Sequence, residues 1–308
     1  MAAVAVITRT ANRPLMLKRA RASVTAQTFR DFVWIVVNDG GTPAPVEAEI
    51  AAAREAGLNA TLVNSDTPAS MERASNLGVR ASRSRYVAIH DDDDSWEPNF
   101  LKIMVNALER ESRFVGAVSH TATVTETVEG DRILYLDRRP QNRWLRAVHL
   151  ADLAIGNLFP PISFLYRRER FDAVAGYDES FPVLGDWDFN LKMALSGDIL
   201  VVPEMLANYH VRIGNKPPTA AYANSVTSQQ DLHRLQDALF RNRVLRTDMA
   251  ANRIGIGWML MFARLQHQAR RTPHITPRWT RSVVHRTLAS IGRLFSRFAV
   301  QPDKELRP

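Results

Sequence analysis

Four consecutive carboxylates, Asp91 to Asp94, are the side chains of this sequence best suited to chemistry. They follow an apolar run, residues 86–90, that fits a buried strand, and Pro98 then opens a helical pattern. Adjacent negative charges repel one another, and Mg²⁺ or Mn²⁺ would relieve that repulsion while also binding substrate phosphates. The alternative is a solvated acidic turn at the start of a helix. The preceding strand and the following proline favour the metal.

Strands and helices alternate through the first half of the chain, and this alternation would position the acidic run. The predicted order is strand 3–8, helix 14–26, strand 32–37, helix 46–56, strand 60–64, helix 71–81, strand 86–90 and helix 98–111. Such alternation predicts a parallel sheet with right-handed crossovers, in which ligands bind beyond the carboxyl ends of strands. No GxGxxG motif follows the first strand, so a mononucleotide-binding half-fold is the better interpretation.

The second half of the chain is less regular. It contains predicted strands at 114–119, 162–166 and 199–202, a hairpin at 121–136, a helix from about 185 to 196, and a strand-like segment at 206–210. Residues 214–218 are rich in turn formers, so a domain boundary is expected there. We predict one domain over residues 1–215 and a basic α-helical extension over 216–308.

Composition sets limits on the function. The 308 residues are 45% apolar and 23% charged, as in ordinary globular proteins, and they include no cysteine, which excludes disulfides, thiolate zinc sites and a cysteine nucleophile. Arg9 and Arg13 interrupt the first apolar run, so it reads as a strand rather than a signal peptide. No apolar run approaches the roughly 20 residues of a membrane span. A reducing, cytoplasmic location is therefore expected.

The positive charge is concentrated at the end of the chain. Residues 226–308 carry about +10 of the formal charge of +8, which leaves about −2 for the rest. This distribution argues against a nucleic-acid groove across the body. Helical patterns cover 226–249, 253–271 and 278–300, and the last places arginines between apolar residues. It suits the anionic inner face of a cell membrane; alternatively, its apolar face packs on the body.

From about residue 4 to residue 212, the sequence resembles the family 2 glycosyltransferases of the GT-A fold. The motifs that carry the resemblance are Val-Ile-Thr-Arg at 6–9, Val-Asn-Asp-Gly-Gly at 37–41, Glu-Arg-Ala-Ser-Asn-Leu-Gly at 72–78, the acidic run with Trp96 and Pro98, Gly-Asp-Trp-Asp-Phe at 185–189 and Asn-Tyr-His at 208–210. The resemblance implies a Rossmann-like, mostly parallel mixed α/β sheet flanked by helices, with the basic helices as a C-terminal extension.

The resemblance also implies a nucleotide-sugar site. Thr8 and Asp39 fall where the family holds the base and ribose, although Asp-Gly is also an ordinary turn pair. Arg73 lies near the usual basic contact to the nucleotide, or else is a solvated helix arginine. In the family's Asp-any-Asp motif, Asp91 would face the ribose, with Asp92 beside it.

Two metal ligands follow from the same resemblance. Asp93 would bind the cation that bridges the two phosphates, and His210 would complete its coordination, although a lone histidine is often structural. Asp94 is expected to cap the next helix. His90 is expected to pack or to support the site from behind.

Asp186 matches the family's general base, which deprotonates the acceptor hydroxyl opposite the leaving diphosphate. Gly185 stands where the family usually has Glu, so Asp188 is the alternative base. Two residues apart on a helix, the two carboxylates point in different directions, and only one can face the site. Trp96 and Trp187 are expected to be core residues or sugar-stacking platforms.

The activity implied is inverting, metal-dependent glycosyl transfer with Mn²⁺ or Mg²⁺. The donor would be a UDP-sugar, and the acceptor a hydroxyl of a glycan or lipid-linked molecule in cell-surface polysaccharide synthesis. A sugar-phosphate nucleotidyltransferase would need a glycine-rich loop after the first strand, and residues 8–12 contain no glycine. A catalytically silent adaptor would lack a carboxylate of the site, yet all the expected ones are present.

Overall fold

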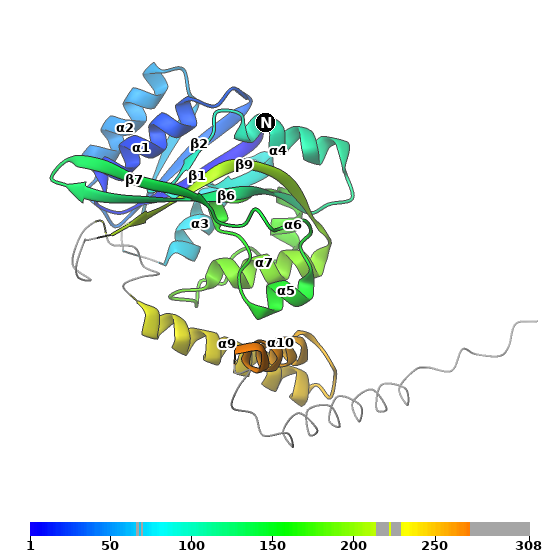
Figure 1. Ribbon diagram of the computed structural model, residues 1–308. Helices are drawn as coiled ribbons and strands as arrows, with labels where there is room; N and C mark the ends of the chain where they lie inside the picture. The colour runs from blue at the N-terminus through cyan, green and yellow to red at the C-terminus, as the bar shows by residue number, and fades with distance from the viewer. Residues whose placement is uncertain (66–67, 69, 214–221, 223–228, 272–308) are drawn as a thin grey trace, which may run out of the picture. The chain divides into compact units, whose positions relative to one another are not determined.

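The computed structural model describes residues 1–65, 68, 70–213, 222 and 229–271 (Figure 1). The chain divides into two compact units, Met1–Leu260 and Met261–Pro308. The first holds the sheet and most of the helices. In the second, the end of the last described helix is seen. The boundary that the sequence predicts between residues 215 and 216 stays a prediction.

A mixed sheet forms the centre of the first unit. Its strands are β1 (Ala2–Thr10), β2 (Phe32–Asp39), β3 (Ala60–Ser65), β4 (Ser84–Ile89), β5 (Ser95–Trp96), β6 (Gly116–Glu129), β7 (Arg132–Pro140), β8 (Phe164–Arg167) and β9 (Ile199–Arg212). They lie in the order β3-β2-β1-β4-β8-β6-β9-β5, and β7 pairs with β6. The first four are mutually parallel, β9 is parallel to β6, and β8 runs antiparallel to both its neighbours. The carboxyl ends of β1 and β4 therefore meet at one edge.

Helices cover both faces of this sheet (Figure 1). The helices of the described residues are α1 (Pro14–Thr25), α2 (Pro43–Glu55), α3 (Met71–Arg80), α4 (Phe100–Arg110), α5 (Leu150–Ile155), the 3₁₀ turn η1 (Pro161–Ser163), α6 (Arg168–Ala173), α7 (Gly185–Ser196), α9 (Gln230–Ala250) and α10 (Ile256–Arg271). Because both faces of the sheet are covered, the central strands β1 and β2 are largely apolar runs.

Alternate residues of the central strands supply two hydrophobic cores. Val6 and Trp34 pack under α1, α2 and α4, whereas Ile7 and Ile35 face α3, α6 and α7. This is the two-residue period of a strand. Gly78 lets α3 approach the sheet, since a Cβ there would overlap Ile7. Each core thus holds one set of helices against the sheet, and polar side chains lie at the ends of these helices.

Helix α9 belongs to the first unit and packs on α5 and α7. Its Phe240 lies edge-on to Trp187, with ring centroids 5.2 Å apart. The buried Arg241 donates to the carbonyl oxygens of Ala154 and Ile155, both at 2.9 Å. These carbonyls end α5, so a side chain from α9 satisfies groups that a helix end leaves without a partner.

Several predicted elements differ in extent. The hairpin is confirmed as β6 and β7, which turn at Gly130. The predicted pieces at 199–202 and 206–210 form one strand, β9, because it pairs with β6 along most of its length, through two register shifts. Helix α4 begins at Phe100, two residues after Pro98. The short α5 and β5 were not predicted, since so few residues show no periodicity.

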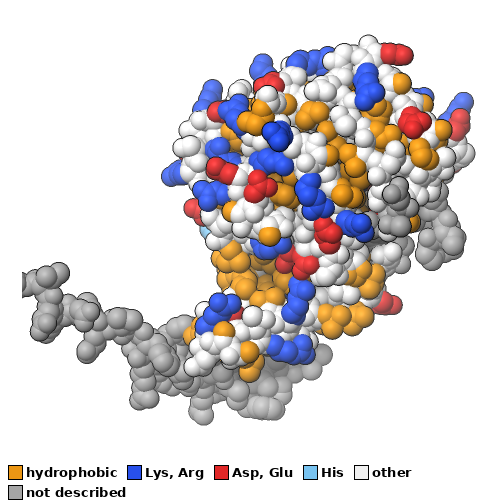
Figure 2. Space-filling view, turned by 180° about the vertical axis from the view of Figure 1, so that it is seen from behind, with side chains coloured by type: hydrophobic (Ala, Val, Ile, Leu, Met, Phe, Trp, Pro, Cys, Tyr) orange, Lys and Arg blue, Asp and Glu red, His pale blue; other side chains and the backbone are white. Residues whose placement is uncertain are grey.

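The predicted amphipathic helix at 278–300 lies outside the described residues. Within the part of the chain that is described, no helix has the length and apolarity to cross a membrane. On the face of the protein in Figure 2, Lys and Arg side chains are interspersed with Asp and Glu rather than gathered in one basic groove.

Candidate active site

A cavity of about 430 Å³ lies at the carboxyl ends of β1 and β4. This size is within the usual range for small-molecule sites. It is lined by Arg9, Arg13, Met71, Glu72, Asp91, Asp93, Gln141, Asn157, Phe159, Pro160, Pro161, Tyr177, Val183, Leu184, Asp186, Tyr209 and His233. Carboxylates, arginines and aromatic rings therefore line one cavity. Asp91, Asp93 and Asp186 are the predicted site residues that the structure brings together here.

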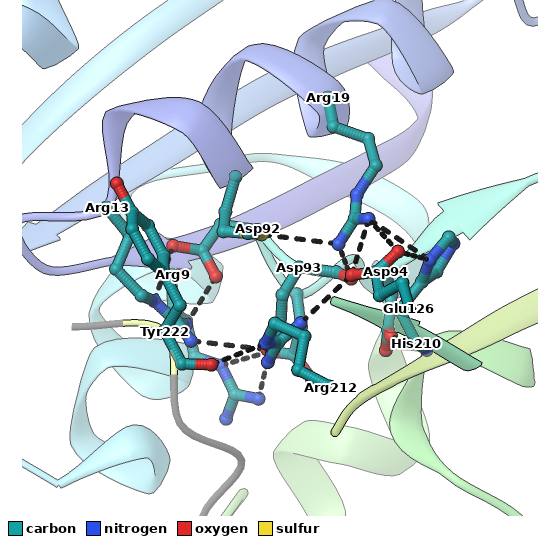
Figure 3. Close-up of polar contacts among 12 residues, drawn as sticks. Arg9, Arg13, Arg19, Asp92, Asp93, Asp94, Glu126, His210, Arg212 and Tyr222 are labelled. Carbon is teal, nitrogen blue, oxygen red and sulfur yellow. Dashed lines mark hydrogen bonds and ion pairs between the residues drawn. The ribbon is translucent and has the colours of Figure 1, made fainter. Parts of the chain in front are cut away.

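Arginines from the end of β1 and the start of α1 neutralise the acidic run (Figure 3). The Arg9 guanidinium donates to Asp91 Oδ1, at 2.9 Å from Nε, and also to Ser75 Oγ at 3.0 Å. Arg13 donates to Asp92 and, at 3.2 Å, to Asp93 Oδ2. Burial raises the pKa of Asp92 to about 6 although Arg13 opposes the shift. The ion pairs thus keep a crowded set of carboxylates in place.

A further arginine approaches from β9. Arg212, whose side chain is fully buried, donates to Asp93 Oδ2. Although burial acts in the opposite direction, Arg13 and Arg212 hold the pKa of Asp93 well below its usual range. Asp93 is therefore an ionised carboxylate between two guanidinium groups.

Glu126 on β6 connects Arg19, His210 and Arg212. Arg19 Nη1 lies 2.7 Å from Glu126 Oε2, and His210 Nδ1 lies 2.7 Å from the same oxygen. The pKa of Glu126 is lowered to about 2 because the bonds from His210 and Arg19 outweigh its burial. Burial lowers the pKa of His210, which fits a neutral ring that donates from Nδ1 to Glu126.

The predicted metal ligands are already engaged by other side chains. Asp93 is paired with Arg13 and Arg212, and His210 uses Nδ1 for Glu126 and Nε2 for Ser95 Oγ at 2.9 Å. Among the residues that the structure describes, no three His, Asp or Glu side chains gather as metal ligands would. As arranged here, these side chains do not fit a divalent cation, because Asp93 is paired with Arg13 and Arg212 and both ring nitrogens of His210 have partners.

Asp186 lies at the start of α7 and lines the cavity. Its Oδ2 accepts a hydrogen bond from Asn157 Nδ2 at 2.7 Å, and Asn157 in turn accepts from Asn190 at 2.9 Å. Burial raises the pKa of Asp186, with Asp91 adding to the effect. Leu184, just before the helix, has a φ of 70°, which is uncommon for a residue with a side chain. Two asparagines and a strained turn thus orient this carboxylate.

Asp188, the alternative base, does not line the cavity. It lies 3.1 Å from Lys192 Nζ, one turn along α7, and it is largely buried. This is the divergence expected for two residues spaced i, i+2 on a helix.

Three predicted nucleotide-binding residues lie outside the cavity wall. Thr8 is buried, and its Oγ1 accepts from Trp34 Nε1 at 2.8 Å. Asp39 ends β2 and is half-buried, while Arg73 is exposed on α3. Their roles, like that of Asp92, whose side chain is fully buried behind Arg13, stay predictions.

The expectation that Asp94 caps α4 is wrong. Its Oδ1 accepts from the backbone N–H of His210 at 2.9 Å, because β9 passes directly over the acidic run. Trp96 stacks on Phe100 at 4.3 Å between centroids, and it is buried like Trp187. The core alternative therefore holds for both tryptophans. Asn76 braces a turn through the backbone of Tyr177.

His90 is a packing residue, edge-on to Trp96 at 4.5 Å between ring centroids, and burial lowers its pKa to about 4.

The lowered pKa of His90 makes the stability of the fold depend on pH. Its contribution is complete above pH 6.5, the pKa of a histidine in the unfolded chain, and is lost as the pH falls toward 4. We expect the free energy of unfolding to fall by about 2 kcal/mol more in the parent than in His90→Gln between pH 7.5 and 5. Urea unfolding at both pH values measures this difference. The exposed His149→Gln is the control and should behave like the parent; equal pH dependence in His90→Gln would contradict the prediction.

The chain is similar to proteins of a known family. The family described as Glycosyl transferase family 2 matches residues 5–172, more than half of the chain. The chain belongs to this family and is a glycosyltransferase. Its sheet and flanking helices have the predicted GT-A arrangement, which solved glycosyltransferases share.

Individual relatives are distant. A PGL/p-HBAD biosynthesis glycosyltransferase of Mycobacterium tuberculosis is 26% identical over 75% of this chain and 82% of its own length. An uncharacterized glycosyltransferase of Nostoc sp. is 28% identical over 88% of this chain and 82% of its own length. The crystal structure of S. aureus TarS 1-349 in complex with UDP-GlcNAc has a TM-score of 0.57 at 18% identity, covering 79% of this chain and 66% of that one. Of uncomplexed TarS 1-349, the chain spans 60%, with a TM-score of 0.53.

Several residues of the site were not predicted from the sequence, namely Arg9, Arg13, Arg212 and Glu126. Arg9 and Arg13 follow the first strand, whose end must lie beside the acidic run in a parallel sheet, so their charge was a usable signal. Glu126 gives no such sign, because it lies within a weakly alternating hairpin. His233 is reached only through the packing of α9, far along the chain.

Proposed function

We propose that this glycosyltransferase transfers a sugar, with inversion, from a UDP-sugar to a hydroxyl group of a glycan or lipid-linked acceptor. The observation that carries the proposal is a single cavity that is lined both by Asp186 and by the arginine-paired carboxylates Asp91 and Asp93. A base and a cationic phosphate-binding region are the two parts that an in-line displacement requires.

Each part has a role that its surroundings support. Arg9 and Arg13 line the cavity and can donate to a diphosphate, since guanidinium groups bind phosphate oxygens with two N–H donors. Asp91 is the proposed partner of the ribose. Asp186, held by Asn157, removes the proton of the acceptor hydroxyl as that oxygen attacks the anomeric carbon. Asp188, paired with Lys192, supports α7 instead.

A panel of UDP-, dTDP- and GDP-sugars, titrated by calorimetry, tests the donor. We expect binding of at least one UDP-sugar and competition by UDP, because the cavity combines arginines with a carboxylate that can take ribose hydroxyls. Analysis of the product's anomeric configuration by NMR tests inversion. If no nucleotide sugar binds, the proposal is wrong; a retained configuration would overturn only its inverting part.

Metal dependence stays a prediction. Enzymes of this family commonly use divalent metals, but Asp93 and His210 are engaged by other residues as described above. Activity in EDTA, followed by addition of Mn²⁺ or Mg²⁺, tests the prediction. Full activity in EDTA would mean that guanidinium groups alone offset the charge of the diphosphate.

The proposed location is the cytoplasmic face of the cell membrane, near a lipid-linked acceptor, and it rests on the sequence of residues 278–300. Their arginines alternate with apolar residues in the sequence, which is typical of helices that bind anionic lipid surfaces. Co-sedimentation with anionic and neutral vesicles tests the location, and equal binding to both would contradict its electrostatic basis.

A further inference from the structure

Glu72 is a buried carboxylate in the wall of the cavity to which no role has been given above. It is the second residue of α3, and only 3% of its surface is exposed. Its Oε2 has no hydrogen-bond partner among the described residues. Buried polar atoms are rarely left in this state, and each one calls for an explanation, such as a functional role or a bound water or ion.

The surroundings of Glu72 account for only part of its carboxyl group, since Oε2 has no partner among the described residues. Its burial raises the pKa; Arg9 and hydrogen bonds from its own N–H and from Ser70 oppose this shift, while the charge of Asp186 adds to it. An apolar side chain of similar size would avoid the cost of burying an unpartnered oxygen. Replacing the carboxylate with such a side chain is therefore not expected to lower the stability of the protein.

The neighbouring helix makes room for this carboxylate. Gly185, the first residue of α7, has no side chain, and a Cβ built there would overlap Glu72, at 2.5 Å from its Cδ. The carboxyl of Glu72 thus occupies the space beside Asp186 that a side chain at 185 would fill. A residue from α3 and a glycine on α7 fit each other at the cavity wall.

We propose that Glu72 is a sugar-binding residue, whose carboxylate accepts a hydrogen bond from a hydroxyl group of a sugar in the cavity. The proposal rests on the proposed function and adds a recognition residue to it. Because the last torsion angle of a glutamate is broadly distributed, a rotation of the carboxyl group would present an oxygen to the cavity that Glu72 lines. A hydroxyl donor there would supply the hydrogen bond that Oε2 lacks among the described residues.

The hydroxyl can belong to the donor sugar or to a sugar acceptor, and binding measurements separate the two. Affinities of UDP and of UDP-GlcNAc and UDP-glucose are measured for the parent and for Glu72→Gln. If the donor sugar is bound, the variant loses about ten- to a hundredfold in UDP-sugar affinity while its UDP affinity is unchanged. If the acceptor is bound, donor affinity is unchanged and the acceptor KM rises by a similar factor.

A stability measurement distinguishes this role from a structural one. Glu72→Met replaces the carboxylate with an apolar side chain of similar size, and we expect its Tm without ligand to equal or exceed that of the parent. The matched control is Glu111→Gln, which alters an exposed ion pair with Arg113 and should change neither Tm nor sugar affinity. A lower Tm in Glu72→Met with undiminished sugar binding would identify Glu72 as structural and overturn the proposal.

The sharpest test moves the carboxylate from residue 72 on α3 to residue 185 on α7. In Glu72→Ala/Gly185→Asp, a carboxylate from α7 enters the space that Glu72 leaves, so the double variant should recover sugar affinity that Glu72→Ala loses. Parent-like UDP-sugar affinity and acceptor KM in Glu72→Gln would overturn this proposal alone. A parent protein that binds no nucleotide sugar would instead refute the proposed function itself.

Discussion

Replacing Asp186 with Asn should lower the transfer rate constant by about a hundred- to ten-thousandfold, the range expected when a general base is removed. The amide keeps the shape of the carboxylate and can still bond to Asn157, but it cannot accept the acceptor's proton. Donor affinity should change little, because the residues proposed to bind the diphosphate are Arg9 and Arg13. Steady-state kinetics of transfer, with calorimetric titration of the UDP-sugar, measure both effects.

Asp188→Asn is the matched control for that experiment. Its carboxylate contacts Lys192 rather than the cavity, so transfer should stay within a few-fold of the parent rate. If Asp186→Asn transferred sugar at the full rate, Asp186 would not be the base. If only Asp188→Asn were impaired, the alternative assignment would be correct.

Replacing Glu126 with Gln should cost about 3–5 kcal/mol of folding free energy, the usual penalty when one partner of a buried ion pair is removed. Glu126 is 2% exposed and contacts Arg19 and His210, with Arg212 at 3.5 Å. Without its charge, two largely buried guanidinium groups lose a counter-ion. Thermal unfolding should show a Tm lower by on the order of 10 °C.

The pH dependence of that variant adds a second check. The pKa of Glu126 is lowered to about 2 in the folded protein, so its contribution is complete above pH 4.5 and is lost as pH falls toward 2. The difference in stability between the parent and Glu126→Gln should therefore narrow below pH 4.5. The surface variant Glu169→Gln, whose ion pair with Arg170 is exposed, should lose less than about 1 kcal/mol. A similarly small loss in Glu126→Gln would contradict the prediction.

Periodicity and turn residues were enough to predict the parallel half of the sheet. Runs such as 32–37 and 86–90 are apolar throughout because helices cover both faces, and the helices between them show a clear amphipathic stripe. The position of the acidic run beyond β4 followed from the same rule. The antiparallel insertion of β8 between β4 and β6 did not, since it depends on pairing between segments far apart in sequence.

The part of the candidate site at the ends of β1 and β4 and at the start of α7 was predictable from the sequence, whereas the residues that reach it from β6, β9 and α3 were not. The motifs that contain Asp91, Asp93 and Asp186 could be recognised from their order along the chain, and all three side chains line the cavity. Arg212 and Glu126 reach the acidic run only because β9 and β6 pair over a long register, which no local pattern reports. Glu72 was not predicted for a similar reason, since its proposed role depends on the absence of a side chain at Gly185, which is far away in the sequence.

A shortened form of the enzyme needs residues beyond the sheet, because the end of α5 is bound by a side chain of α9. Asn157, which holds Asp186, follows directly on the carbonyls of Ala154 and Ile155 that Arg241 binds from α9. A chain truncated at residue 215 would leave these carbonyls without their partner and expose Trp187 to solvent. Expression of a shortened enzyme should therefore retain residues through Leu260, so that the loop carrying Asn157 keeps its anchor.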